Sequence, residues 1–212
     1  MTELCWAEDG SDAAVADAVA AVVARPGAKT LVLPGGTTPG PILADLAARD
    51  LPWATATLIP GDERVVPAGH PASNYGALTR LFGATGARVV PLVIGPVRTL
   101  VRQVVRPQFD LVWIGMGADG HVASLFPSSD PDPAAPAAVI AVTPDPLPAE
   151  APFNRLTLTL AALVDTPQVI VVIRGNAKHA LLEAAAAGPN DLPIARLLTA
   201  ARGPVTVYWS PA

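Results

Sequence analysis

Cysteine is almost absent from this chain of 212 residues, which contains only Cys5. A single cysteine excludes an intrachain disulfide, and a reducing compartment is the simple expectation. Histidine is nearly as scarce, because the chain has only His70, His121 and His179, and their positions show no zinc-type spacing. The sequence therefore predicts neither a disulfide-stapled fold nor a zinc site.

Long apolar runs and clusters of basic charge are also missing. No stretch is apolar for the roughly 18 residues that a membrane helix needs, and the segment 1–9 lacks the basic start of a secretory signal. The 14 basic residues are scattered and the net charge is −4, which does not indicate a nucleic-acid partner. These absences predict a cytoplasmic protein without a membrane or nucleic-acid partner.

Hydrophobic residues, by contrast, make up 51% of the chain and charged residues only 15%, which is typical of a compact globular protein. Aromatic residues contribute 5% and alanine is abundant, so helices are expected to pack closely through small side chains. The length suffices for one well-buried core and is short for two, which predicts a single domain over residues 1–212.

Strand patterns and helix patterns alternate along the chain. Apolar or alternating runs predict strands at 29–33, 55–59, 88–94, 109–114, 137–142, 154–160, 168–173 and 205–209. Helical patterns cover 13–24 (with Ser11 as the N-cap), 41–49, 73–82, 97–105, 175–187 and 193–201. No repeat of fixed period is present. This alternation predicts an α/β fold with a mostly parallel sheet covered by helices on both faces.

A glycine-rich turn at 34–40 joins a predicted strand to the next helix. Glycine and proline are ordinary turn residues, so the turn also fits a plain connection. In the functional interpretation, Gly35 and Gly36 let a ligand approach the backbone, and Thr37 and Thr38 add hydroxyl donors beside helix N-terminal amides. The pattern is neither Walker A nor Gly-x-Gly-x-x-Gly, so a phosphate fits it better than a dinucleotide.

Charged residues recur where predicted strands end. The triplet Asp62-Glu63-Arg64 follows a strand, and although most such clusters are solvated surface, an arginine there offers planar donors to a carbonyl or carboxylate. Arg155 and Lys178 are either surface charges or are brought back to the same sheet edge. Lys178 lies in the first turn of a predicted helix, a poor place for a cation unless an anion is nearby.

The segment 115–127, GMGADGHVASLFP, follows a predicted buried strand and contains Asp119 and His121. Ligands bind at the carboxyl ends of strands in open α/β sheets. A histidine titrates near neutrality and can pass a proton between water and a leaving group, while a nearby carboxylate orients its ring. A lone histidine is more often structural, and metal ligation is the rival role. Ser124 lacks the Gly-x-Ser-x-Gly setting of a serine nucleophile.

Five ordered blocks together resemble the 6-phosphogluconolactonase family, within the wider group that includes glucosamine-6-phosphate deaminases. The blocks are PGGTTP at 34–39, DERVVP at 62–67 with Ser73-Asn74-Tyr75, the segment 115–127, RLTLT at 155–159 and GNAK at 175–178. They span nearly the whole chain, and the segment 115–127 is the most specific of them.

The resemblance implies a three-layer, Rossmann-like α/β fold and the hydrolysis of 6-phospho-D-glucono-1,5-lactone to 6-phosphogluconate in the oxidative pentose phosphate pathway. It implies no metal, no cofactor and no obligate protein partner. His121 would be the general base that activates water, Asp119 would support it, and Arg64 would face the lactone or its developing oxyanion. The implied substrate- and phosphate-binding residues are Gly35, Gly36, Thr37, Thr38, Asp62, Asn74, Arg155 and Lys178.

The chain departs from the family pattern in three places. Ser128 stands where the family often has glycine, Pro34 and Thr37 replace serines of the phosphate loop, and the region 95–108 looks short. The nearest alternative is a glucosamine-6-phosphate deaminase, but the acidic residue of that branch is missing from the segment 123–127. A non-catalytic sugar-phosphate-binding protein is the other alternative, and the intact pair of Asp119 and His121 argues against it.

Overall fold

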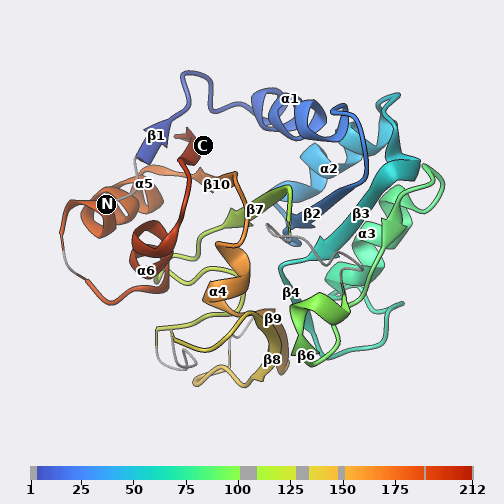
Figure 1. Ribbon diagram of the computed structural model, residues 1–212. Helices are drawn as coiled ribbons and strands as arrows, with labels where there is room; N and C mark the ends of the chain where they lie inside the picture. Colours follow the sequence, from blue (N-terminus) through green and yellow to red (C-terminus); the bar gives the residue numbers. More distant parts are fainter. Residues whose placement is uncertain (1–3, 101–108, 128–133, 148–150, 189, 212) are drawn as a thin grey trace.

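A computed structural model describes residues 4–100, 109–127, 134–147, 151–188 and 190–211 of the chain (Figure 1). Seven strands form one sheet in the order β1-β11-β10-β7-β2-β3-β5, and every pair in it is parallel. These strands are β1 (Leu4–Trp6), β2 (Lys29–Leu33), β3 (Ala56–Pro60), β5 (Arg88–Val89), β7 (Leu111–Gly115), β10 (Val169–Arg174) and β11 (Val205–Ser210). The mostly parallel sheet predicted from the sequence is confirmed.

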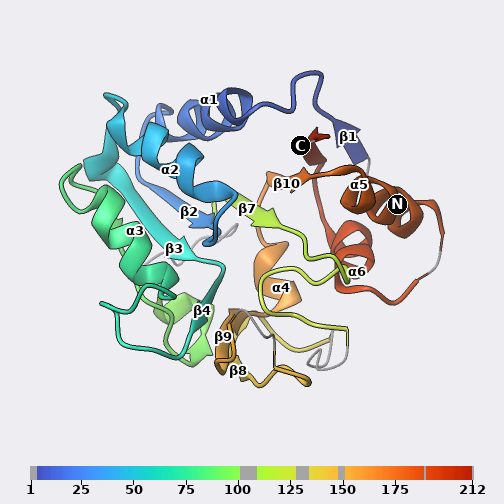
Figure 2. The same ribbon diagram turned by 180° about the vertical axis from the view of Figure 1, so that it is seen from behind.

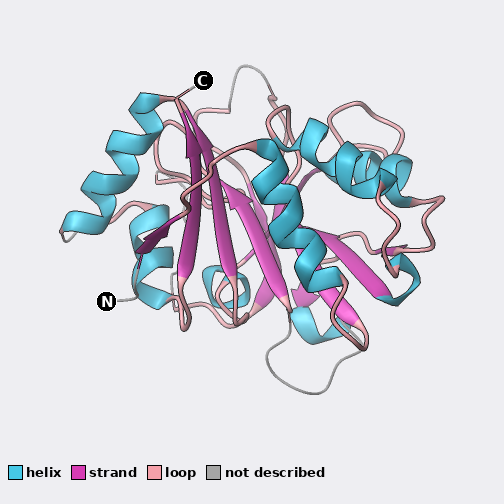
Figure 3. Ribbon diagram, turned by 90° about the horizontal axis from the view of Figure 1, so that it is seen from above, coloured by secondary structure: helices cyan, strands magenta, loops and turns pink. Residues whose placement is uncertain are grey.

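Helices cover both faces of this sheet and make three layers (Figure 3). One face packs against α1 (Asp12–Val23), α2 (Pro39–Ala48) and α3 (Asn74–Phe82). The other face packs against α4 (Leu160–Leu163), α5 (Asn176–Ala187) and α6 (Pro193–Ala200). Neighbouring residues of one strand enter different cores: Trp113 of β7 packs with α1 and α2, whereas Ile114 packs with α5 and α6. This alternation is the two-residue period of a strand buried on both faces.

A second, smaller sheet lies below the main one in Figure 1 and is antiparallel. Its order is β4-β9-β8-β6, with β4 (Asp62–Arg64), β6 (Gly95–Pro96), β8 (Ala138–Val142) and β9 (Arg155–Leu158). The sequence predicted strands at 137–142 and 154–160 but did not assign them to a separate sheet. The sequence predicts that the charge cluster Asp62-Glu63-Arg64 follows a strand, and the structure shows that the triplet itself forms β4.

Most predicted elements agree with the structure to within two residues. The Ser11 N-cap is confirmed, since its Oγ accepts a hydrogen bond from Ala14 N–H at 3.2 Å. The strand predicted at 88–94 is wrong beyond its start: pairing ends after the bond from Val90 N–H to Leu58 O, because β3, the neighbour of β5 in the main sheet, ends at Pro60.

The helix predicted at 97–105 begins as a single 3-10 turn, η2 (Val97–Thr99), and residues 101–108 lie outside the described part of the chain. The sequence did not predict β1, the short α4 or the 3-10 turn η1 (Trp53–Thr55). Among the helices of the described residues, none combines the length and apolar character that a membrane span requires.

The direction in which strands are added to the main sheet reverses between β2 and β7. After β2 the chain continues to β3 and β5 on one side, whereas β7, the other neighbour of β2, is followed by β10 and β11 on the opposite side. This reversal leaves a crevice outside the carboxyl ends of β2 and β7, which is where open α/β sheets bind ligands. Figure 2 shows the molecule from behind, with the loops that follow the carboxyl ends of the strands.

Candidate functional site

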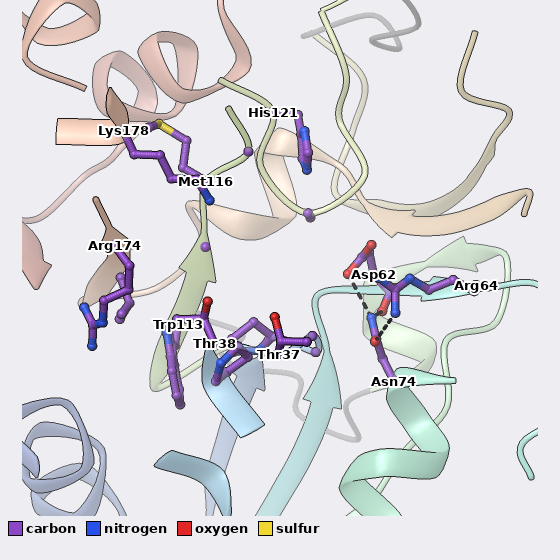
Figure 4. A pocket seen from close by; sticks show the side chains of 18 residues that line it. Thr37, Thr38, Asp62, Arg64, Asn74, Trp113, Met116, His121, Arg174 and Lys178 are labelled. Atoms are coloured by element: carbon purple, nitrogen blue, oxygen red, sulfur yellow. Dashed lines mark hydrogen bonds between the residues drawn. The ribbon is translucent and has the colours of Figure 1, made fainter. Parts of the chain in front are cut away.

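A cavity of about 360 Å³ opens at the carboxyl ends of β2, β7 and β10, next to β4 (Figure 4). It is lined by most of the residues predicted from the sequence, namely Gly35, Gly36, Thr37, Thr38, Asp62, Arg64, Asn74, His121 and Lys178. These residues lie up to 143 positions apart in the chain, from Gly35 to Lys178. The parallel sheet brings them together because the turns after its strands share one edge.

His121 and Asp119 form a close pair at the edge of the cavity. Nδ1 of His121 lies 2.6 Å from Oδ1 of Asp119, and the same oxygen accepts the backbone N–H of His121 at 3.1 Å. The loop closes on itself through a hydrogen bond from Gly117 N–H to His121 O at 2.9 Å. The ring of Phe126 packs against the imidazole with centroids 4.7 Å apart. The hydrogen bond of Nδ1 and the aromatic contact thus orient the imidazole, and the two backbone hydrogen bonds hold the loop that carries it.

The negative charge of Asp119 determines which ring nitrogen of His121 carries the hydrogen. Burial alone raises the pKa of Asp119, but the hydrogen bonds from His121 and the charge of its imidazolium form outweigh burial and hold the pKa below its ordinary value. An ionised carboxylate only accepts, so Nδ1 of His121 carries the hydrogen. Nε2, which has no hydrogen-bond partner among the described residues, is left as the basic nitrogen.

Arg64 is tied to the histidine loop by a chain of hydrogen bonds, and Figure 4 shows its first part, from Arg64 through Asn74 to Asp62. Its Nη1 donates to Oδ1 of Asn74 and to the carbonyl of Ala72, both at 3.0 Å. The carboxamide of Asn74 then donates to Oδ1 of Asp62 at 3.1 Å. Oδ2 of Asp62 accepts from Ser124 Oγ at 2.6 Å. The predicted residues Asp62 and Asn74 therefore orient Arg64, and Ser124 links them to the segment that carries His121.

Glu63 is a buried positioning residue that the sequence reasoning did not single out. Its Oε1 accepts the backbone N–H groups of Arg64 and Asn74, each at 2.8 Å. Its Oε2 accepts from Tyr75 N–H at 2.7 Å and from Ser73 Oγ at 3.0 Å. The carboxylate thus satisfies the free amides at the start of α3. Strand alternation was the available signal, because it turns Glu63 away from the face of Asp62 and Arg64.

The backbone of the glycine turn lies closer to Asn74 than a residue with a side chain at position 35 would allow. A Cβ built on Gly35 would overlap the carboxamide of Asn74. Gly36 has a φ of +106°, in the region that favours glycine. The side chain of Thr38 makes no capping bond at the start of α2, so its hydroxyl is available to a ligand in the cavity.

Lys178 lines the cavity from the first turn of α5. Its ammonium group makes no hydrogen bond or ion pair with any other described residue. A cation near the positive end of a helix dipole is destabilised unless an anion lies close by. This arrangement favours a negatively charged ligand on that side of the cavity.

Asp119 and Arg155 are the two predicted residues that do not line the cavity; Asp119 lies behind His121, whereas Arg155 has no such partner in the lining except Arg64 beside it. Arg155 is 3% exposed and pairs in register with Arg64 across β4 and β9, with Nη2 donating to Ala151 O at 2.8 Å. Its Nη1 has no partner among the described residues. Burial lowers the pKa of Arg155, and the like charge of Arg64 lowers it further. Its predicted contact with phosphate stays a prediction.

Three lining residues lie outside the motifs singled out from the sequence, namely Trp113, Val172 and Arg174. The available signal for Arg174 was a basic residue at the end of a buried strand, directly before Gly175. Ser128, a departure noted in the sequence, lies outside the described residues. Within the described residues, no group of three or more His, Cys, Asp or Glu side chains is placed to hold a metal ion, and the expectation of a metal-free site stays a prediction.

The parallel sheet, the cavity at its switch point and the histidine–carboxylate pair define an α/β protein with an acid–base site for a small anionic ligand. Comparison with known proteins identifies the family. The sequence model of the glucosamine-6-phosphate isomerases/6-phosphogluconolactonase family matches residues 8–209, so the chain belongs to this family.

Relatives within this family cover nearly the full length of the chain. It is 37% identical to a 6-phosphogluconolactonase of Caulobacter vibrioides over 96% of this chain and 94% of the relative. It is 35% identical to one from Mesorhizobium japonicum over 93% of this chain and 88% of the relative. A solved 6-phosphogluconolactonase from Shewanella baltica superposes with a TM-score of 0.81 at 26% identity, covering 99% and 98% of the two chains. A monomeric glucosamine-6-phosphate deaminase shares the fold at 14% identity, with a TM-score of 0.77.

Proposed function

We propose that this chain is a 6-phosphogluconolactonase, which hydrolyses 6-phospho-D-glucono-1,5-lactone to 6-phosphogluconate in the oxidative pentose phosphate pathway. The observation that carries the proposal is the pair of His121 and Asp119, 2.6 Å apart, at a cavity that also holds Arg64 and Lys178. The relatives named above support the substrate. The cytoplasmic location expected from the sequence is part of this proposal.

His121 acts as the general base in this mechanism. Its Nε2 takes a proton from a water molecule, and the resulting hydroxide attacks the lactone carbonyl carbon to form a tetrahedral oxyanion. The ring C–O bond then breaks, and the proton on Nε2 passes to the departing ring oxygen, which becomes a hydroxyl of the product. Asp119 holds the imidazole in the required tautomer and stabilises its charged form.

Arg64 stabilises the negative charge that develops on the lactone carbonyl oxygen. Its guanidinium is already oriented by Asn74 and Ala72 O, so little reorganisation is needed when the oxyanion forms. A lactone is an activated ester, and one base, one water and one cationic donor suffice for its hydrolysis.

The phosphate is held away from the reacting carbon. Gly35, Gly36, Thr37 and Thr38 supply backbone and hydroxyl donors from the glycine turn, and Lys178 supplies charge. Arg155 lies behind Arg64 and adds positive potential. Binding energy gained at the phosphate orients the lactone for attack.

The decisive experiment measures acid release from freshly generated 6-phosphogluconolactone by the purified protein. We expect hydrolysis well above the spontaneous rate, and His121→Ala is expected to lower kcat about 10²- to 10⁴-fold while retaining the far-UV circular dichroism of the wild type. His70→Ala is the matched control, because His70 does not line the cavity. A wild-type rate equal to the spontaneous one would refute the proposal, and ammonia release from glucosamine 6-phosphate would favour the deaminase instead.

A further inference from the structure

Arg174 is the last residue of β10 and lines the cavity, although neither the sequence motifs nor the mechanism above assigns it a role. It shares a strand face with Val172, which also lines the cavity. In Figure 4, Arg174 and Lys178 lie on one side of the cavity, whereas Asp62, Arg64 and Asn74 lie on the other. The cavity thus has a second cationic wall opposite Arg64.

The hydrogen bonds of Arg174 hold its guanidinium without using all its donors. Nη1 donates to Ile173 O at 3.0 Å and to Tyr208 O at 3.3 Å. Nη2 donates to Oδ1 of Asp12 at 2.6 Å. The Nε–H and one Nη2–H have no acceptor among the described residues. Two donors of a positioned guanidinium are therefore available to an oxygen-rich anion.

The charges on this wall suit a doubly negative group. Arg174 and Lys178 contribute two positive charges, and Asp12 at the start of α1 is the carboxylate that pairs with Arg174. The side chain of Asp12 is 53% exposed, against 18% for Arg174, so solvent screens the carboxylate more than the guanidinium. The wall keeps a net attraction for anions even with the ion pair formed.

A purely structural role for Arg174 would not require it to line the cavity. An arginine that pairs with α1 without lining the cavity is Arg49, which contacts Asp17 of α1 at 2.7 Å and Asp45 of α2 at 2.8 Å. Arg49 joins helices without lining the cavity, whereas Arg174 does line it.

We propose that Arg174 binds the phosphate of the substrate together with Lys178 and makes the site specific for phosphorylated lactones. This inference rests on the proposed lactonase function. The carbonyls of Ile173 and Tyr208 hold the guanidinium at the cavity rim, and the Nε–H and Nη2–H that have no acceptor among the described residues contact two phosphate oxygens. Arg174 takes no part in the chemistry at the carbonyl, so its effect belongs to substrate affinity.

The test compares Arg174→Gln and Arg174→Lys with the wild type. Loss of a charge-assisted bidentate contact is expected to raise KM for 6-phosphogluconolactone about tenfold or more in Arg174→Gln, with kcat nearly unchanged. Arg174→Lys keeps the positive charge but lacks the planar pair of donors. Its KM is expected to lie between that of the wild type and that of Arg174→Gln. Hydrolysis of unphosphorylated glucono-1,5-lactone is expected to stay at the wild-type level in both variants. An equal loss on both lactones, or no loss on either, would overturn the inference.

Two further variants separate the guanidinium from the ion pair. Asp12→Asn removes the same ion pair but keeps Arg174, so it is expected to leave KM within about threefold of the wild type, a span of under 1 kcal/mol. If Asp12→Asn raised KM as much as Arg174→Gln, the effect would come from docking of α1 and the inference would fail. Arg49→Gln removes an equivalent pair remote from the cavity and serves as the matched control.

Calorimetry makes this test independent of turnover. Inorganic phosphate and 6-phosphogluconate are titrated into the wild type and Arg174→Gln, and a Kd about tenfold higher in the variant is expected for both probes. An unchanged Kd refutes the role of Arg174 even if the wild type is an active lactonase. An inactive wild type that still binds both probes through Arg174 would refute only the lactonase proposal. Binding of neither probe by the wild type would refute both.

Discussion

Asp119 shows how a single carboxylate acquires its role from its immediate neighbours. Its side chain is 53% exposed, which would normally leave it an unremarked surface charge. The ring and backbone N–H of His121 nevertheless hold its pKa below the ordinary value, against the opposing effect of burial. Ser124 and Glu63 follow the same rule, because each acquires its role from a partner that the fold supplies, Asp62 for the serine and the first turn of α3 for the glutamate.

Replacement of Asp119 by asparagine tests this at the level of one residue. Asp119→Asn is expected to lower kcat by on the order of a hundredfold, because the amide no longer favours the required tautomer or the charged imidazole. Steady-state kinetics of both proteins at neutral pH check this. An unchanged kcat would show that the carboxylate does not act on His121.

The same residue sets a small pH dependence of stability. The pKa of Asp119 is depressed in the folded chain, so its contribution is present above the ordinary carboxyl value of 3.8 and is lost as the pH falls through the folded pKa. The difference in free energy of unfolding between the wild type and Asp119→Asn is therefore expected to shrink below about pH 4. Solvent screening keeps this difference small at neutral pH.

At the scale of elements, two turns hold the site by leaving out a side chain. A Cβ on Gly117 would overlap the imidazole of His121 and come within 2.7 Å of Oδ1 of Asp119. A Cβ on Gly35 would overlap Asn74, which orients Arg64. Each turn therefore sets the position of a functional side chain through backbone that passes close beside it.

Gly117→Ala is expected to lower kcat about tenfold or more, because the added methyl group must displace the imidazole from its position beside Asp119. Gly40→Ala is the matched control: a Cβ there meets no atom within 4 Å, and alanine favours α2 by roughly 0.5–1 kcal/mol. Steady-state kinetics and chemical denaturation of both variants check the prediction. Equal kcat in Gly117→Ala and Gly40→Ala would contradict it.

At the scale of the whole molecule, the two sheets share one of the two hydrophobic cores. Val139 of β8 and Leu158 of β9 belong to the same buried cluster as Val112 and Ile114 of β7. The small antiparallel sheet, which carries Arg64, is thus packed onto the large parallel sheet, which carries His121. A shared core keeps the two halves of the site in a fixed relation.

A shared core predicts that the chain unfolds as a single domain in one cooperative transition. Far-UV circular dichroism and tryptophan fluorescence are expected to give coincident denaturation curves. Leu158→Ala, at a position with no exposed surface, is expected to lower the free energy of unfolding of the whole chain by about 2–5 kcal/mol. Two separated transitions, with only one of them shifted by Leu158→Ala, would contradict the single-domain prediction.

Much of the fold was predictable because its signals are local. The strand at 29–33 and the helix that Ser11 caps follow from apolar periodicity and capping chemistry over a few residues. The pairing of Asp119 with His121 was predictable for the same reason, since the two residues are two positions apart in a glycine-rich turn. The strand predicted at 88–94 failed beyond Val89, because its length depends on the partner strand β3, which ends at Pro60.

The sequence by itself determined the order of strands and helices, the glycine turns and the acid–base pair, because each depends on neighbours in the chain. Only the tertiary structure decided which distant residues meet. Ser124 reaches Asp62 because the antiparallel sheet carries β4 to the histidine loop. Arg174 reaches the cavity wall and Asp12 because β10 ends beside α1, whereas Arg155 is buried beside Arg64. Strand order and strand face decide such contacts, and neither is encoded by spacing along the chain.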